Sequence, residues 1–319
     1  MGVRKRLITV FIILLASSFT FADSAQQLLS AGRVDDAISA LQRQTSANPN
    51  DAESYNLLCR AYFSLGNWDR GIAACEKAVS LQPDNSRYHL WLGRIYGEKA
   101  DSANFLSAAR LAGKVRTEFE KAVQLSPNSA DARTDLAEFY LEAPGIVGGG
   151  QDKAEAEARS LAPLDPVKSH WVSGRIAEKK HDSAAAEREY RAAVEASHGN
   201  SIAWLNLAFF YRRAQRLDDM EDAINHAASA QMNRPEVLVE AAETLIRSGR
   251  NFQEAADLLR RYLASSTVEE APAFKAHYLL GTVLEKEGKK QEAAQEYRAA
   301  LSMAKDFSRA RDALARLDE

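Results

Sequence analysis

Two stretches of twenty residues, AGRVDDAISALQRQTSANPN at 31–50 and LGNWDRGIAACEKAVSLQPD at 65–84, repeat one pattern at a fixed distance. Gly32 and Gly66 begin their turns 34 residues apart. In both stretches a polar turn with glycine precedes apolar residues at helical spacing. A fixed period of this length indicates an array of similar supersecondary units, and missing it would give the wrong fold.

The same pattern extends through the chain. Pro49 and Pro83 keep the 34-residue distance, and each ends a helix-period segment. Later copies read YRRAQRLDDMEDAINHA at 211–227 and EKEGKKQEAAQEYRAAL at 285–301. Each unit therefore consists of a first helix, a short polar turn and a second helix.

These residues resemble the tetratricopeptide repeat (TPR) family, whose signature sets aromatic, small and proline residues at fixed positions of a helix pair. One unit supplies Tyr55, Leu58, Cys59, Tyr62, Gly66, Trp68, Gly71, Cys75, Ala78 and Pro83. Others supply Trp204, Leu207, Ala208 and Tyr211, and His277, Leu280, Gly281, Leu284, Gly288, Ala293, Tyr297 and Ala300. The resemblance covers nearly all of 23–306. It implies an all-α, right-handed α-solenoid that binds other proteins.

We expect eight stacked hairpins at 23–306 and an amphipathic capping helix at 307–319. The hairpins begin near Asp23, Asp51, Asn85, Ser129, Val167, Ser201, Arg234 and Phe274. Two of them are longer than 34 residues, with inserts at about 97–113 and 143–152. Both inserts fall between a first and a second helix, so they are expected on the same rim.

The first 22 residues read as a secretory signal peptide. Arg4, Lys5 and Arg6 precede an apolar run, and Ala22 ends a small-residue cleavage site. An uncleaved anchor is the alternative, although the apolar run is short for a membrane span. Cleavage predicts a protein of the bacterial periplasm or cell envelope with no membrane span.

The net charge is −3, and without residues 1–22, which hold three basic and no acidic residues, it is −6. The chain therefore has no basic footprint for nucleic acid. His89, His170 and His277 fall where other units place a packing aromatic. The glycine-rich GIVGGGQDKA at 145–154 lacks the ending of a phosphate-binding loop. We predict no catalytic residue, no metal and no cofactor.

We consider three functions for the chain. The first is an interaction scaffold that holds a segment of a partner protein in its concave groove. The second is an enzyme or small-ligand binder with a site on the two inserts, and the third is a structural spacer. Fold alone does not decide function, but the resemblance implies the first, so we predict an interaction scaffold that is not an enzyme and keep the second as the alternative.

The helix period predicts a line of residues along the concave face of the first helices, which we call the groove lane. The small residues where paired helices approach closely are Cys59, Gly93, Ala137, Gly174, Ala208, Ala242 and Gly281. The residue after each of these small residues is rotated by about 100° around the first helix, which turns it toward the concave face of the stack. The predicted partner-binding groove comprises Asn56, Arg60, Arg94, Trp171, Arg175, Phe209 and Tyr278. Its arginines suit an acidic or carboxylate-ended peptide. Alternatively, Glu138 neutralises Arg94 and Arg175 in a solvated ladder.

Cys59 and Cys75 lie on the two helices of one hairpin, at nearly equal distance from its turn. Antiparallel helices bring them face to face, and an oxidising compartment permits a disulfide. Two buried thiols that pack as small core residues are the alternative.

Overall fold

The computed structural model describes residues 25–230 and 234–317, which are folded almost entirely into helices. Within these two ranges the extended structure is limited to one isolated β-bridge, between Val268 and Ala271. No helix in them is long and apolar enough to cross a membrane. The predicted signal peptide at 1–22 lies outside the described residues, as do the last two residues of the predicted capping segment.

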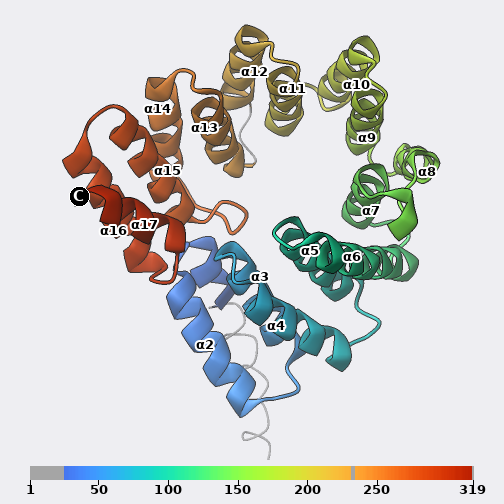
Figure 1. Ribbon diagram of the computed structural model, residues 1–319, viewed down its shortest axis with the longest axis horizontal. Coiled ribbons are helices and arrows are strands. Elements are labelled where there is room, and N and C mark those ends of the chain that lie inside the picture. The colour runs from blue at the N-terminus through green and yellow to red at the C-terminus, as the bar shows by residue number, and fades with distance from the viewer. Residues whose placement is uncertain (1–24, 231–233, 318–319) are drawn as a thin grey trace, which may run out of the picture.

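Within the described ranges, eight antiparallel helix pairs follow one another, and each packs on the next (Figure 1). In the first, a helix at 25–30 pairs with α2 (Val34–Ala47). The others are α3 (Ala52–Ser64) with α4 (Trp68–Leu81), α5 (Ser86–Asp101) with α6 (Phe105–Leu125), α7 (Ala130–Glu142) with α8 (Gln151–Leu161), α9 (Pro166–Lys179) with α10 (Ser183–Ala196), α11 (Ser201–Arg213) with α12 (Leu217–Ser229), α13 (Glu236–Ser248) with α14 (Phe252–Leu263), and α15 (Ala273–Lys286) with α16 (Lys290–Met303). The predicted all-α solenoid of eight hairpins is confirmed.

Side-chain caps fix where many of these helices begin. In eight helices a polar residue just before the helix accepts a hydrogen bond from a backbone N–H of the first turn. These residues are Asp51, Asn85, Asn104, Ser129, Asp165, Asp182, Asn200 and Asn251. Each such cap stabilises its helix by about 1 kcal/mol. The caps divide a chain rich in helix-forming residues into short helices of defined length.

The small residues predicted at the close approach of paired helices are buried there. A Cβ atom added to Gly93 would lie 2.4 Å from the ring of Phe119 on the second helix of the same hairpin. At Gly174 the corresponding ring is that of Tyr190, at 2.9 Å. At these two slots the second helix thus fills the space with an aromatic side chain, which leaves room only for glycine on the first helix.

Tyrosines one turn further along join successive hairpins. The Tyr140 hydroxyl donates to Glu120 at 3.0 Å, from α7 to the second helix of the preceding hairpin. The Tyr211 hydroxyl donates to Glu187 in the same way at 2.8 Å, and its burial raises the pKa of Tyr211 to about 12. These phenols stay protonated at neutral pH, so the hydrogen bonds between hairpins persist.

The two inserts lie together on one rim. The ten extra residues of the third hairpin lengthen α5 and α6, and α6 reaches 21 residues. The extra residues of the fourth hairpin form the short 3₁₀ helix η1 (Gly145–Val147) before α8. Arg116 of α6, just after the first insert, donates to the carbonyl oxygen of Val147 at 3.3 Å, and Phe105 and Ile146, one from each insert, line the same hollow.

The first and last hairpins also contact each other, so the array closes on itself (Figure 1). The Thr267 hydroxyl donates to the carbonyl oxygen of Ser30 at 2.7 Å. The backbone N–H of Lys305 donates to the Asp35 carboxylate at 2.9 Å. The sequence predicts a curved stack but not this contact, which we call the closure.

Apolar packing and one glycine complete the closure. Leu29 and Val34 share a hydrophobic core with Phe274 and Phe307 from the other end of the chain. Gly32 has φ +72°, and a Cβ there would lie 2.6 Å from the backbone nitrogen of Ala273. The repeat's turn glycine therefore serves both the tight turn and the approach of the last hairpin.

The capping helix α17 (Ser308–Leu317) packs on α16. Ala310 and Ala313 are buried, whereas Arg311 and Asp312 are exposed, which is the predicted amphipathic pattern. Just before the helix, the Phe307 ring meets that of Phe274 edge to face at 5.0 Å. The helix thus covers the apolar face of the eighth hairpin.

Candidate functional site

A cavity of about 680 Å³ lies among α11, α13, α15 and the start of α17. Figure 1 shows α11, α13 and α15 on the inner side of the array, with α12 and α14 outside them. One set of lining side chains is apolar or aromatic: Phe209, Val239, Ile246, Tyr278, Leu279 and Phe307. Cavities of this size hold small organic ligands or a few side chains of a peptide.

Basic side chains make up much of the remaining wall. They are Arg212, Arg213, Arg247, Lys275 and Arg309, and they face three acidic residues, Glu240, Glu243 and Glu270. Arg213 pairs with Glu178, which lies outside the cavity lining, and Arg247 pairs with Glu243. Within 25–230 and 234–317, no ion pair involves Arg212, Lys275 or Arg309. The cavity therefore carries an excess of positive charge on a chain whose net charge is negative.

Two of these cations are partly removed from water. The Nε atom of Arg212 is buried without an acceptor among the described residues. Burial lowers the pKa of Arg212, and the neighbouring guanidinium of Arg247 adds to the effect. Burial also lowers the pKa of Lys275, again with a nearby cation, Arg309. A buried donor without an acceptor is costly, so an incoming anion that reached it would gain binding energy.

Glu240 gives the cavity a charge that changes near neutral pH. Burial, and next the nearby carboxylate of Glu236, raise the pKa of Glu240 to about 7. Its negative charge is therefore only partly present at neutral pH and disappears in mild acid.

Two of the predicted groove residues, Phe209 and Tyr278, line this cavity. The Tyr278 ring packs edge to face on Phe307 at 5.4 Å, which fixes one wall. Both residues come from first helices, as the groove lane requires.

Arg60 and Asn56 are placed differently. The Arg60 guanidinium donates two hydrogen bonds to the Glu269 carboxylate, at 2.7 and 2.6 Å. Both side chains are about nine-tenths buried. Asn56, one turn earlier, is fully buried and is not a groove residue as predicted. The closure brings the segment around Glu269 against α3, so this part of the lane faces protein.

Arg94 and Arg175 are also paired within the chain. Arg94 donates to Asp135 at 2.6 Å, and its guanidinium lies 5.1 Å from the centre of the Trp91 ring. Arg175 bridges Glu138 and Glu142 and lies over the ring of Trp171. Glu138 thus pairs with one of the two arginines that the ladder alternative assigned to it.

Comparisons with known proteins match both ends of the chain. Tetratricopeptide repeat profiles match residues 28–95 and 239–306. A solved structure, a thermophilic TPR protein of Thermus thermophilus, superposes with a TM-score of 0.51 at 18% identity. The match covers 61% of this chain and 98% of that one. This chain is a TPR protein.

A longer protein aligns with most of this chain. The TPR chain is 23% identical over 265 residues to the human protein O-mannosyl-transferase TMTC3, which covers 82% of this chain. The mouse protein of the same name is 23% identical over 168 residues, or 51% of this chain and 18% of its own length. This chain spans only 28% of the human protein's length, so the activity in that name is not carried over.

Three of the six histidines of the TPR protein bond to glutamates in their own hairpins. His89 contacts Glu118 at 2.6 Å, and His277 contacts Glu296 at 2.6 Å. His170 contacts Glu189 at 2.8 Å. The predicted aromatic positions therefore also carry polar contacts. Among the residues that the structure describes, no cluster of three metal-binding side chains occurs.

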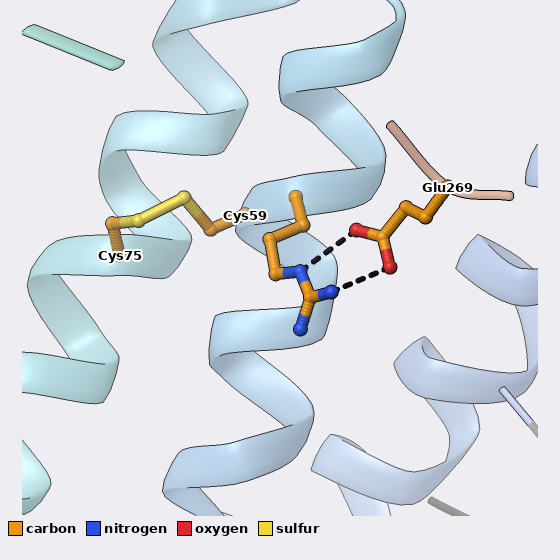
Figure 2. The surroundings of a disulfide bond; sticks show 4 residues. Cys59, Cys75 and Glu269 are labelled. Carbon is orange, nitrogen blue, oxygen red and sulfur yellow. Dashed lines mark hydrogen bonds and ion pairs between the residues drawn. A yellow bond between two sulfur atoms is a disulfide. The ribbon is translucent and has the colours of Figure 1, made fainter. Parts of the chain in front are cut away.

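Cys59 and Cys75 form a disulfide between α3 and α4, with their Cα atoms 5.2 Å apart (Figure 2). The small slot lets the two helices approach closely enough for this bond. Figure 2 shows Glu269 on the other side of α3 from the disulfide. Because Cys59 and Arg60 are adjacent, the bond holds the turn of α3 that carries the closure's buried ion pair.

The sequence lane of the TPR protein misses Arg212 and Lys275. Arg212 lies three residues after Phe209, and Lys275 lies three residues before Tyr278. Both are therefore one helical turn from predicted residues on the same face. Including the residues one helical turn before and after each predicted groove residue would have identified both.

Proposed function

We propose that this TPR protein is an interaction scaffold that binds an extended, acidic and partly apolar segment of a partner protein. The segment occupies the cavity among α11, α13, α15 and the start of α17. This proposal moves the predicted groove from Arg60, Arg94 and Arg175, which are paired within the chain, to the part of the lane that holds Phe209 and Tyr278.

The observation that carries the proposal is one cavity that combines apolar walls with cations that make no ion pair with any residue the structure describes. Arg212, Lys275 and Arg309 offer donors to carboxylates, and the guanidinium fork binds a carboxylate at two points. Phe209 and Tyr278 offer anchors for an apolar side chain, as buried aromatics do at the centre of protein interfaces. The tetratricopeptide fold itself supports a protein-interaction scaffold in general.

We also propose that the protein acts in the periplasm or cell envelope of a bacterium. The basic start, apolar run and small-residue end of residues 1–22 support export. The Cys59–Cys75 disulfide is consistent with an oxidising compartment.

A displayed library of random peptides tests the site without a known partner. Selection on the purified protein should enrich sequences with several Asp or Glu residues beside an aromatic or aliphatic one. Arg212→Ala and Lys275→Ala should each weaken binding of a synthetic selected peptide by about tenfold, the usual effect of losing a charge-assisted contact. Added salt should weaken it too.

Arg188→Ala is the matched control, because Arg188 is exposed on α10 and makes no ion pair within the described residues. It should leave the affinity unchanged. Selected peptides that lack acidic residues, or that bind both cavity variants as tightly as the unaltered protein, would remove this cavity as the site.

A further inference from the structure

Three carboxylates follow one another along one face of α13, at Glu236, Glu240 and Glu243. Their spacing places each carboxylate about one helical turn from the next. Glu236 pairs with Arg234, and Glu243 pairs with Arg247, both at 2.6 Å. No ion pair involves Glu240 in the part of the chain that the structure describes. The middle carboxylate therefore has like charges as neighbours and no described cation in contact.

Glu240 is also partly removed from water, because it lines the cavity among α11, α13, α15 and α17. An ionised carboxylate loses hydration there, and neighbouring carboxylates repel it, so both effects favour the protonated form. Burial, and next Glu236, raise the pKa of Glu240 to about 7, although the nearby cation of Arg234 opposes the shift. The geometry and the pKa thus agree that Glu240 exchanges its proton near neutral pH.

Charged groups from each element that lines the cavity surround Glu240. They are Arg212 and Arg213 of α11, Glu243 and Arg247 of α13, Glu270 of the segment before α15, Lys275 of α15 and Arg309 of α17. The helices α12 and α14, which also pack on α13, contribute no residue to the described lining. That lining includes no histidine, the side chain that ordinarily changes charge between about pH 5 and 8. A change in the charge of the cavity near pH 7 therefore comes from Glu240.

We infer that the proton on Glu240 controls how tightly the cavity holds an acidic segment, which binds more tightly in mild acid than in mild base. The inference rests on the proposed function, because it concerns the regulation of that same site. As pH rises, loss of the proton adds a negative charge to the wall, where it repels the carboxylates of the ligand. Those carboxylates ordinarily titrate near pH 4 and stay ionised throughout this range. The protonated carboxyl, by contrast, offers them an O–H donor.

The protonated fraction of Glu240 limits the size of the effect. With a pKa of about 7, this fraction falls from about nine-tenths at pH 6 to about one-tenth at pH 8. Complete exclusion of the ligand by the ionised form would lower the affinity about tenfold over this range, because apparent affinity scales with the competent fraction. Partial repulsion gives less, so we expect a decrease of about three- to tenfold.

Fluorescence anisotropy with one synthetic peptide tests the inference. The probe is an acidic peptide from the displayed library, chosen without histidine and with both ends capped, so that its own charge is constant between about pH 6 and 8. The unaltered protein should bind this peptide about three- to tenfold more tightly at pH 6 than at pH 8. Glu240→Gln, which is neutral at both pH values, should bind it tightly at both. Glu195→Gln, an exposed control on α10, should keep the pH dependence of the unaltered protein.

A carbon-13 NMR titration follows the proton itself, and the Glu240 signal is identified by its absence from the Glu240→Gln spectrum. The signal should titrate near pH 7 in the free protein, and bound peptide should raise the pKa further, because the coupling between proton and peptide is reciprocal. An ordinary carboxyl pKa for Glu240 in the free protein would overturn the inference without any peptide.

Two binding results would overturn the inference and leave the proposed function intact. One is equal affinity at pH 6 and pH 8 in a protein whose binding Arg212→Ala still weakens. The other is a pH dependence that persists in Glu240→Gln, which would assign it to Lys275, whose pKa burial lowers. A peptide that binds Arg212→Ala as tightly as the unaltered protein would instead remove the proposed site, and this inference with it.

Discussion

Arg60 and Glu269 lie 209 residues apart in the sequence and form a two-point, buried ion pair between the second hairpin and the segment before the eighth. Arg60 was predicted to grip a partner protein. Its partner in the structure is a carboxylate of the same chain. Arg60 therefore does not face a partner protein but helps to hold the two ends of the array together.

Breaking this pair should open the closure. Arg60→Met leaves Glu269 buried without its cation and should lower the free energy of unfolding by about 3 kcal/mol. Adding Glu269→Gln should recover most of that loss, because the buried charge is then gone. Chemical denaturation measures both, and hydrogen exchange at 25–47 should rise in the single variant. Arg33→Ala removes an exposed pair with Asp36 and should change stability by less than about 0.5 kcal/mol. An equal effect of both arginines would contradict a structural role for the closure.

Alanine substitutions at two glycines of α5 distinguish the contribution of side-chain packing to stability from that of helix propensity. Gly93→Ala should cost about 1–3 kcal/mol, because its Cβ would lie 2.4 Å from the Phe119 ring. Gly97→Ala meets nothing within 4 Å and should stabilise the protein by about 0.5–1 kcal/mol. Thermal unfolding of the two variants should therefore shift in opposite directions. Shifts of the same sign would show that the slot is not tightly packed.

The disulfide should contribute to stability by limiting the unfolded chain. Cys59 and Cys75 are 16 residues apart, and a loop of this length predicts a loss of about 3 kcal/mol in the double alanine variant. Thiol titration of protein from an oxidising compartment, denatured without reductant, should find no reactive cysteine. Two free thiols per chain would rule the bond out.

Glu240 should make stability depend on pH. Its carboxyl has a pKa of about 7 in the folded chain against an ordinary value of 4.5, so the folded chain holds this proton more tightly. The contribution of Glu240 to the free energy of unfolding therefore falls as pH rises from about 4.5 to about 7. Glu240→Gln should stabilise the protein by about 2 kcal/mol at pH 8 and by much less at pH 4. Glu195→Gln, an exposed control on α10, should show no such difference. Denaturant titrations at the two pH values measure it, and a gain independent of pH would assign the effect to packing.

Removing the capping helix should expose apolar surface. A chain ending at Asp306 lacks Phe307, which packs on Phe274 and Tyr278, and lacks the buried Ala310 and Ala313. We expect aggregation and a lower unfolding midpoint. Arg311→Ala, on the exposed side of the helix, should have neither effect. A truncated protein that stays soluble and equally stable would show that α17 is not a cap.

The repeats could be predicted from sequence because each one places similar residue types at the same positions of its helix pair. Gly93 and Gly174 stand at the same point of their hairpins and meet an aromatic ring from the second helix in both. Such contacts join residues within one or two units, so the 34-residue period is enough to reveal them. The hairpins, the cap and the rim position of the inserts all follow from this local rule.

The closure and the cavity could not be predicted in the same way. Glu269 lies in a segment that interrupts the repeats, and nothing near it in the sequence shows that it faces Arg60. Phe209 and Tyr278 were found because helix rotation alone places them on the inner face. Which arginines remain unpaired depends on acids in neighbouring hairpins, such as Asp135 for Arg94, and the helix period does not determine those pairings.

The closure also changes how the array comes apart and how it forms. In an open row of repeats each unit touches only its neighbours, and the outermost units unravel first because they are held on one side. Here both terminal units have a second neighbour, because hydrogen bonds join Thr267 to Ser30 and Lys305 to Asp35. Contacts across more than two hundred residues form late, since the intervening chain must first be ordered. We therefore expect the ends to join last during folding, and fraying from either end of the array to begin with the loss of these contacts.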